Sequence, residues 1–484
     1  MHVTTTSPGV SAPRTVIPIV AAPADEEMVS LYAAREKIHP RSVSGVFSRW
    51  RWWMVWITQL AFYGLPWLEW NARQAVMFDL EARRFYLFGL VLYPQDFIYL
   101  TGLLVISALS LFLFTAVAGR LWCGFACPQT VYTEIFLWIE KKVEGDRSAR
   151  LRLDGSKLSA AKFGKKTLKH ALWVGLAMWT GFTFVGYFAP IRELGALTVG
   201  GALGPWQTFW VLFYGFATYG NAGFLREQVC KYMCPYARFQ SAMFDKDTMI
   251  VTYDVQRGEP RGARSKKADP KALGLGACVD CTLCVQVCPT GIDIRKGLQY
   301  ECIGCAACVD VCDDVMDKVG YARGLIRFST QNGVAQGWNT RQMLQRALRP
   351  RVLVYTVILL GITLALGVSL FMRTPLKVDV IRDRGALARV VEQGRIENVF
   401  RVQIMNATED TQRYVLSVSG LPGITLASES EVEVLPTEVR SAAVRVQIPP
   451  GGARSGSHPI EFEIHSTGEH VARVNERAAF VVPR

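Results

Sequence analysis

Two runs of cysteines near the middle of the chain have the spacing of iron–sulfur ligands. Each run has three cysteines separated by two residues and a fourth cysteine after three more residues. Three thiolates at such gaps bind three irons of one cubane, while the fourth thiolate of each run binds the neighbouring cluster. The runs therefore predict two 4Fe–4S clusters. The first cluster is assigned to Cys278, Cys281, Cys284 and Cys312, and the second to Cys302, Cys305, Cys308 and Cys288.

Structural zinc is the main alternative occupant of these thiol sites, because four thiolates also bind zinc tetrahedrally. Zinc modules usually pair two short Cys-x2-Cys knuckles across a longer gap, whereas here three cysteines follow one another at two-residue gaps. Pro289 follows the first run, as in bacterial ferredoxins, and Asp313 takes its place after the second run. This difference alters the turn and leaves the four-thiol pattern intact. The spacing therefore favours clusters over zinc.

The remaining four of the 12 cysteines form two shorter motifs of the type Cys-x3-Cys-Pro. They are called here the paired cysteines: Cys123, Cys127, Cys230 and Cys234. Residues four apart share one face of a helix, and Pro128 and Pro235 can also start a new helix. Thiolates are soft ligands that suit Cu(I), so the paired cysteines are predicted to be copper or redox thiols. The alternative is that they pack as small apolar side chains, which the repetition of the motif disfavours.

Apolar segments around these motifs are long enough to cross a membrane, which needs ~20 apolar residues per helix. Of all residues, 50% are hydrophobic, and the mean hydropathy is positive, as in membrane proteins. Five spans are predicted: Trp52–Leu68, Phe97–Ala118, Ala171–Ala189, Trp206–Leu225 and Val352–Met372. A further run, Phe85–Tyr93, is too short to span and is interpreted as a lip or re-entrant piece. The two Cys-x3-Cys-Pro motifs follow the second and fourth spans, which forms a faint internal repeat.

Charge asymmetry orients the predicted spans, because loops rich in Lys and Arg stay on the cytoplasmic side. Segments 119–170 and 226–351 are strongly basic, whereas loops 69–96 and 190–205 carry few basic residues. The N-terminus and both basic segments are therefore predicted in the cytoplasm, and residues 373–484 on the far side. The same segments account for the net charge of +13, so no nucleic-acid partner is predicted. No apolar signal-peptide region precedes the first span.

The C-terminal part of the sequence has a different residue pattern, without cysteines or long apolar runs. Short alternating runs such as Phe400–Ile404, Tyr414–Val418 and Ile460–Ile464 are separated by Gly, Pro, Asn and Asp, which is typical of an antiparallel β-sandwich. The chain is therefore predicted to be a multi-domain membrane protein with an α-helical bundle, a ferredoxin-like domain and an all-β sandwich. The predicted divisions are the N-terminal segment 1–50, four transmembrane helices in 51–225 with the basic loop 119–170, the di-cluster domain with its linkers in 226–351, the fifth transmembrane helix in 352–372 and the β-domain in 373–484.

Other features of the sequence predict no further cofactor. No Gly-x-Gly-x-x-Gly follows a predicted strand and no P-loop occurs, so a nicotinamide, flavin or nucleotide site is not expected. Electrons must therefore come from a partner or a quinol. His458, His465 and His470 are more typical of scattered surface histidines than of a metal site. The basic run Arg257–Lys267 is interpreted as a linker or as a patch that faces anionic lipid.

From about Tyr32 to Thr330 the sequence resembles the cbb3-type cytochrome c oxidase accessory proteins, a family called CcoG, FixG or RdxA. The C-terminal domain is similar only in position and β character. The linker motifs are more specific for this family than the ferredoxin spacing of the cysteines, which many proteins share. These motifs are Gly119-Arg-Leu-Trp-Cys-Gly-Phe-Ala-Cys-Pro-Gln-Thr130, Asn221-Ala-Gly-Phe-Leu-Arg-Glu-Gln-Val-Cys-Lys-Tyr-Met-Cys-Pro-Tyr-Ala-Arg-Phe-Gln240, Arg257-Gly-Glu-Pro-Arg261, Cys288-Pro-Thr-Gly-Ile-Asp-Ile-Arg295 and Gly297-Leu-Gln-Tyr-Glu-Cys302.

The resemblance implies a bacterial inner-membrane protein with five spans, a polyferredoxin-like cytoplasmic domain and an Ig-like periplasmic domain. It also implies a cupric reductase, a metalloreductase that converts Cu(II) to Cu(I) during maturation of the cbb3 oxidase. Copper would then be the substrate ion, and oxidase assembly factors or copper chaperones would be the partners. The residues implied in the copper chemistry are Cys123, Cys127, Cys230 and Cys234.

Two alternative functions stay open on the sequence alone. The first is a membrane electron conduit that links a quinol to a ferredoxin-type partner, with the paired cysteines in a structural role. The second is a non-redox scaffold for oxidase assembly, in which the clusters only stabilise the fold. The electron donor is not indicated by any motif.

Overall fold

The computed structural model describes residues 37–484 except residues 72, 266–271, 384, 386–387, 468–471 and 484. Most of the expected N-terminal segment 1–50 therefore lies outside the described residues. So do His470, one of the three C-terminal histidines considered above, and the end of the basic run Arg257–Lys267.

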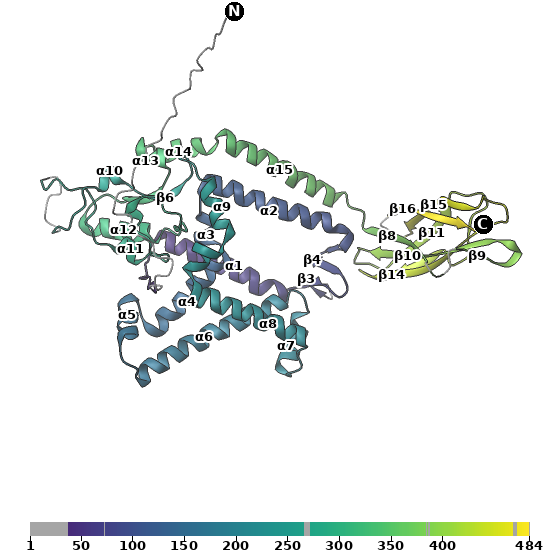
Figure 1. The fold of residues 1–484 in the computed structure, drawn as a ribbon, viewed down its shortest axis with the longest axis horizontal. Coiled ribbons are helices and arrows are strands. Elements are labelled where there is room, and N and C mark those ends of the chain that lie inside the picture. The colour runs from purple at the N-terminus through teal and green to yellow at the C-terminus, as the bar shows by residue number, and fades with distance from the viewer. Residues whose placement is uncertain are drawn as a thin grey trace, which may run out of the picture. The chain divides into compact units, whose positions relative to one another are not determined.

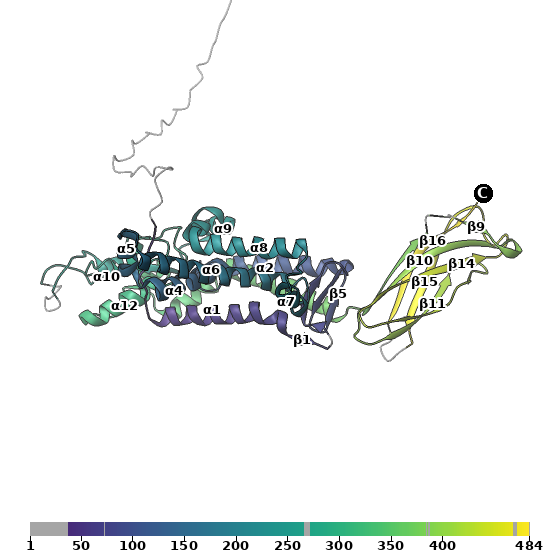
Figure 2. The same cartoon turned by 90° about the horizontal axis from the view of Figure 1, so that it is seen from below.

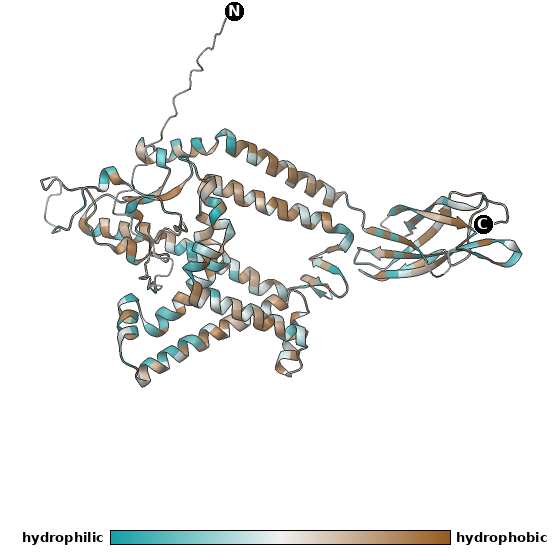
Figure 3. Ribbon diagram, in the orientation of Figure 1, coloured by the Kyte–Doolittle hydropathy of each residue, from teal (hydrophilic) through white to brown (hydrophobic). Residues whose placement is uncertain are grey.

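Within the described residues, two helices are long and apolar enough to cross a membrane. They are α2 (Phe97–Ala118) and α15 (Pro350–Phe371), which run side by side in Figure 1 and are brown along most of their length in Figure 3. The Tyr99 hydroxyl on α2 donates to the Ser369 carbonyl on α15 at 3.1 Å. Gly102 permits the close approach, because a Cβ there would come within 2.7 Å of Leu366. The second and fifth expected spans thus coincide with packed helices.

The other three expected spans fall on helices that are shorter or carry charged ends. They lie on α1 (Val46–Gly64), on α6 (Ala160–Val185), and on α8 (Pro205–Thr218) followed by a π-helical segment, Tyr219–Leu225. Helices α6 and α8 cross closely at small residues, since a Cβ on Gly181 would lie 2.2 Å from the Val211 carbonyl oxygen. Of the described helices, only α2 and α15 meet the length and apolarity of a span, so the five-span bundle stays a prediction.

The segment between α1 and α2 contains short strands. Phe85–Tyr93, interpreted above as a lip or re-entrant piece, contributes to two strands of a three-stranded antiparallel sheet. Arg83 and Phe88 make the two tight turns with positive φ values of 54°. The strands of this region are β1 (Glu69–Trp70), β2 (Arg73–Gln74), β3 (Val76–Asp79), β4 (Arg84–Leu87) and β5 (Leu90–Leu92), and α7 (Ile191–Val199) is the helix after α6.

Short helices and one two-stranded sheet surround the cysteines. Proline begins both helices that follow the Cys-x3-Cys motifs, as expected for a residue that fits the first helical turn. Strands β6 (Ile250–Tyr253) and β7 (Ile326–Ser329) pair antiparallel and belong to the same apolar cluster as Cys278 and Cys284. The helices are α3 (Leu121–Phe125), α4 (Pro128–Glu144), α5 (Arg147–Gly155), α9 (Pro235–Met243), α10 (Val255–Gly258), α11 (Leu283–Gln286), α12 (Ala307–Val319), α13 (Gln331–Ala335) and α14 (Thr340–Ala347).

The C-terminal part is an antiparallel β-sandwich, which confirms the prediction from alternating residues. One sheet has the order β12-β14-β10-β8 with β9 paired to β10, and the other has the order β13-β11-β15-β16 (Figures 1 and 2). Phe400 and Phe462 from opposite sheets meet edge to face at 5.2 Å in a fully buried core. The strands are β8 (Leu376–Arg382), β9 (Arg389–Val390), β10 (Ile396–Asn406), β11 (Gln412–Ser419), β12 (Thr425–Leu426), β13 (Glu431–Val434), β14 (Val439–Ile448), β15 (Gly456–Ser466) and β16 (Arg473–Val482).

Candidate iron–sulfur and thiol site

The two cysteine runs enclose two separate cavities. The first cavity is lined by Cys278, Cys281, Cys284 and Cys312 together with apolar side chains from β7 and α12. The second cavity is lined by Cys288, Cys302, Cys305 and Cys308, and Cys284 also reaches it. The structure therefore brings together the same sets of four residues that the spacing grouped, with the fourth cysteine of each run beside the other run.

Matching backbone turns direct the thiols of each run toward its cavity. Thr282 follows Cys281 with a φ of 54°, and Ala306 follows Cys305 with a φ of 57°. Both residues are left-handed, and both immediately precede a helix that begins inside the cysteine run. Left-handed residues other than glycine are uncommon and persist where the surroundings require them. Their equivalent positions indicate that both runs fold around the same kind of group.

The lining of the cavities fits an iron–sulfur cluster. Four cysteine side chains lie at each cavity together with apolar side chains, and cysteine thiolates are the ligands of 4Fe–4S clusters.

Burial gives these thiols high pKa values. It raises the pKa of Cys284 to about 11 and the pKa values of Cys302 and Cys312 to about 12. Neighbouring thiols add to the rise, because thiolates close to one another repel. Iron binding must therefore displace the protons, so assembly of the clusters is coupled to proton release.

The paired cysteines lie at breaks between helices and not on one helix face. Cys127 and Cys234 are the N-cap residues of α4 and α9, and Pro128 and Pro235 start those helices as expected. Cys123 belongs to the preceding short helix α3, and Cys230 lies in a π-helical turn, Val229–Met233. Of the two arrangements considered for these motifs, the structure therefore has the one in which each proline starts a new helix and the cysteine before it lies in the turn.

The paired cysteines gather on the side of the second cavity. Cys123 and Cys230 pack against the same apolar cluster as Cys305 and Cys308. The Cys123 thiol donates to Gln240 Oε1 on α9 at 3.4 Å. Burial, reinforced by the neighbouring paired thiols, raises the pKa of Cys123 to about 11 and that of Cys230 to about 12. Cys123 and Cys230 therefore lie half-buried next to the second cavity.

Gly124 controls how closely the paired cysteines approach the second cavity. A Cβ on Gly124 would lie 2.7 Å from the backbone nitrogen of Cys305 and 2.8 Å from its Cα. Gly124→Ala is therefore expected to displace the Cys305 segment and to lower the iron content of the purified protein. Iron and sulfide assays measure the effect, with Gly164→Ala as the control, since Gly164 is an exposed helical glycine with no heavy atom within 4 Å of that Cβ. Equal iron contents in the two variants would contradict the contact.

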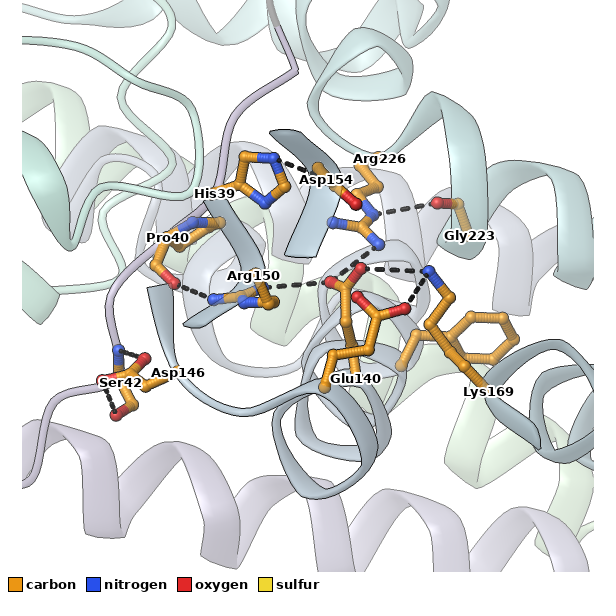
Figure 4. Close-up of polar contacts among 12 residues, drawn as sticks. His39, Pro40, Ser42, Glu140, Asp146, Arg150, Asp154, Lys169, Gly223 and Arg226 are labelled. Carbon is orange, nitrogen blue, oxygen red and sulfur yellow. Dashed lines mark hydrogen bonds and ion pairs between the residues drawn. The ribbon is translucent and has the colours of Figure 1, made fainter. Parts of the chain in front are cut away.

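A buried charge cluster, which the sequence analysis missed, anchors the segments that carry the paired cysteines (Figure 4). Glu140 on α4 is fully buried and pairs with Arg150 at 3.0 Å, Lys169 at 3.5 Å and Arg226 at 3.1 Å. Arg226 also donates to the Gly223 carbonyl at 2.9 Å. The cluster thus ties α4, which follows Cys127, to the chain just before Cys230. In sequence, these residues are indistinguishable from the charges of an ordinary basic loop.

Comparison with protein-family models gives three matches along the chain. A model described as a 4Fe–4S dicluster domain matches residues 225–331, which include all eight cavity cysteines. A model described as a 4Fe–4S binding domain matches residues 100–144, which include Cys123 and Cys127. The C-terminal match, over residues 366–483, is described as an Ig-like fold at the C-terminus of FixG, a putative oxidoreductase. The chain therefore carries ferredoxin-type iron–sulfur domains and an Ig-like domain.

Three curated proteins are similar over most of the chain. Protein RdxB of Cereibacter sphaeroides is 40% identical over 84% of this chain and 86% of its own length. Protein RdxA of the same organism is 40% identical over 81% of this chain and 84% of its own length. The nitrogen fixation protein FixG of Rhizobium meliloti is 37% identical over 87% of this chain and 88% of its own length.

Proposed function

The chain belongs to the family of FixG and the Rdx proteins, and from this premise we propose that it is a membrane-bound cupric reductase. It accepts electrons from an external one-electron donor and reduces Cu(II) to Cu(I) for the maturation of cbb3-type cytochrome c oxidase. Its partners are oxidase assembly factors or copper chaperones, to which the Cu(I) passes. Five helices span the inner membrane, with the di-cluster domain in the cytoplasm and the Ig-like domain in the periplasm.

The observation that carries this proposal is the position of the paired cysteines beside the second cavity. Cys123 and Cys230 pack on the apolar cluster that contains Cys305 and Cys308, so a copper ion on these thiols lies next to the electron store. When bound, the 4Fe–4S clusters supply one-electron storage and transfer. The paired thiols bind Cu(I) more strongly than Cu(II), because soft sulfur ligands prefer the softer ion. This difference in affinity favours transfer of one electron to each Cu(II). The thiols then hold the Cu(I) until a partner removes it.

The test is a stoichiometric reduction of copper by the holoprotein. The full chain is purified anaerobically in detergent, reduced with dithionite and freed of excess reductant before Cu(II) and a Cu(I)-specific chelator are added. The proposal predicts one chelated Cu(I) for every reducing equivalent stored in the protein, and therefore two for a protein with two reduced clusters. A yield no greater than that of the oxidised protein would reject copper reduction.

A second candidate function is favoured by the match of the 4Fe–4S binding model to residues 100–144. Because Cys123 and Cys127 lie inside that match, the paired cysteines could instead belong to the iron–sulfur chemistry of an electron conduit between a quinol and a ferredoxin-type partner. This function predicts more than eight iron atoms per chain. It also predicts that quinol reduces the clusters and that added copper does not affect this reduction. Iron analysis of the wild-type protein and of a variant without the paired thiols distinguishes the two functions.

A further inference from the structure

A polar pocket lies where three segments of the chain meet, next to the second cavity. It has a volume of about 120 Å³ and is called here the junction pocket. Its wall combines residues from 40–52, from 134–150 and from the di-cluster domain, of which Pro289 and Ala307 also line the second cavity. A group bound in the junction pocket would therefore contact α1, α4 and the di-cluster domain together.

Cations outnumber carboxylates among the described residues that line the junction pocket. The charged lining residues are Arg41, Arg51, Lys141, Arg150, Glu134 and Asp146. The Asp146 oxygens already accept the backbone N–H and the hydroxyl of Ser42, both at 3.0 Å (Figure 4). Glu134 is 3.9 Å from Arg51, at the limit of an ion pair. The pocket therefore favours a ligand that carries negative charge.

Two further carboxylates contact residues of this wall, and both already have other partners. Glu140 is shared among the three cations of the buried charge cluster. Asp310 on α12 accepts the backbone N–H groups of Phe47 at 3.1 Å and Ser48 at 2.7 Å, so it caps the start of α1. Neither carboxylate lines the junction pocket, so neither offsets the excess of cations along its wall by direct contact with a ligand there.

Two buried guanidinium groups in the wall each have a donor without an acceptor among the described residues. Arg51 is 7% exposed and Arg150 is 2% exposed, and the Nε of each has no hydrogen-bond partner there. The terminal nitrogens of Arg150 donate to Glu140 at 3.0 Å and to the Pro40 carbonyl (Figure 4). Buried donors without acceptors are uncommon in native proteins. Their place in the wall indicates a pocket that receives acceptor oxygens from a ligand.

An open groove along α1 adjoins the junction pocket and is called here the tryptophan groove. Its volume is about 620 Å³, and it shares Ser48 and Trp52 with the pocket. Trp53 and Trp56 line its apolar side and are 63% and 59% exposed, and Arg49 adds a further cation to its lining. Exposed tryptophans are typical of helix ends at a membrane interface. An apolar groove beside a cationic pocket matches a molecule that has an anionic headgroup and acyl chains.

We propose that the junction pocket and the tryptophan groove bind an anionic phospholipid of the cytoplasmic leaflet. The phosphate lies among the cations of the pocket, and an acyl chain lies along the tryptophans of the groove. Basic pockets between helices on the cytoplasmic side of a membrane bind headgroups of this kind. The bound lipid joins α1, α4 and the di-cluster domain beside the second cavity and so stabilises their arrangement. The inference rests on the membrane placement in the proposed function and is independent of copper.

The test is a lipid titration of the full-length holoprotein, delipidated in a neutral detergent and followed by native mass spectrometry. Phosphatidylglycerol is expected to bind more tightly than phosphatidylethanolamine with the same chains, because the amine of the latter offsets the phosphate charge. The double variant Arg41→Gln/Lys141→Gln removes two exposed cations of the pocket. It is expected to weaken phosphatidylglycerol binding about 25-fold, which is about fivefold for each charge. The control is Lys165→Gln, an exposed position on α6 outside the pocket and the groove, which is expected to keep the wild-type affinity.

Thermal unfolding of the same samples gives a second readout, because a ligand that binds the folded state stabilises it. Phosphatidylglycerol is expected to raise the unfolding temperature of the wild type and of Lys165→Gln, and not that of the double variant. Glycerol 1-phosphate is expected to give no rise, because it lacks acyl chains, and an equal rise with it would overturn the lipid assignment. Equal wild-type affinities for the two lipids, or equal phosphatidylglycerol affinities of the double variant and Lys165→Gln, would also overturn the inference. A full-length protein that stays soluble without detergent would instead overturn the membrane placement in the proposed function.

Discussion

Replacement of all four paired cysteines by serine is expected to reduce Cu(II) reduction to the rate of a protein-free control. The substitution removes the soft ligands that bind copper next to the second cavity, while the eight cavity cysteines keep their positions. Serine fills nearly the same volume, so the packing of Cys123 and Cys230 on the apolar cluster is largely preserved. The readout is chelated Cu(I) per reducing equivalent, measured together with the iron content and the absorption spectrum of the clusters.

The matched control for this variant is Tyr232→Phe. Tyr232 is 68% exposed and lies between Cys230 and Cys234, so its change alters the same segment without removing a thiol. It is expected to leave copper reduction unchanged. Full copper reduction by the four-serine variant, with its iron intact, would exclude the paired cysteines from the chemistry. A wild-type protein with more than eight irons per chain, reduced to eight in the four-serine variant, would instead favour the candidate function in which these thiols belong to iron–sulfur chemistry.

Glu140→Ala is expected to cause the largest loss of stability, about 3–5 kcal/mol in the free energy of unfolding. Glu140 is fully buried and compensates three cations, of which Lys169 also pairs with Glu144 at 2.9 Å. The variant would leave the buried guanidinium groups of Arg150 and Arg226 without their ion pair to Glu140, and removal of one member of a buried ion pair is costly. Denaturant unfolding of the detergent-solubilised protein measures the change.

The control for this prediction is Glu193→Ala, which removes an exposed carboxylate on α7. It is expected to change the free energy of unfolding by less than about 0.5 kcal/mol, as surface substitutions usually do. Because Arg226 lies just before Cys230, Glu140→Ala is also expected to lower copper reduction. Equal stabilities of the two variants would show that the charge cluster of Figure 4 does not hold α4, α5 and α6 together.

The sequence predicts the parts of the fold that depend on local spacing. The gaps of two and three residues between cysteines determine which thiols can face one cluster. The structure places each predicted set of four at one cavity. Alternation of apolar and polar residues over Phe400–Ile404 and Ile460–Ile464 predicts strands that both belong to the sandwich. The uninterrupted apolar runs at α2 and α15 likewise coincide with long helices.

Features that depend on contacts between distant segments are not accessible from the sequence. Arg120 resembles any basic residue at the end of a predicted span, and its contacts with the carbonyl oxygens of Tyr300 and Ala237 become visible only in the structure. Glu140, Lys169 and Arg226 come from three separate segments, so no motif connects them. The sequence leaves open whether Cys123 and Cys127 lie on one helix or at a break, because the four-residue spacing fits one continuous helix and Pro128 can start a new one.

The most direct test of the account is electron paramagnetic resonance of the anaerobically reduced full-length protein before and after the addition of Cu(II). The account predicts eight irons per chain, signals of two reduced 4Fe–4S clusters, and their loss on addition of stoichiometric Cu(II) as Cu(I) appears. A colourless protein that contains zinc in place of iron would contradict it. So would cluster signals that persist unchanged in the presence of Cu(II).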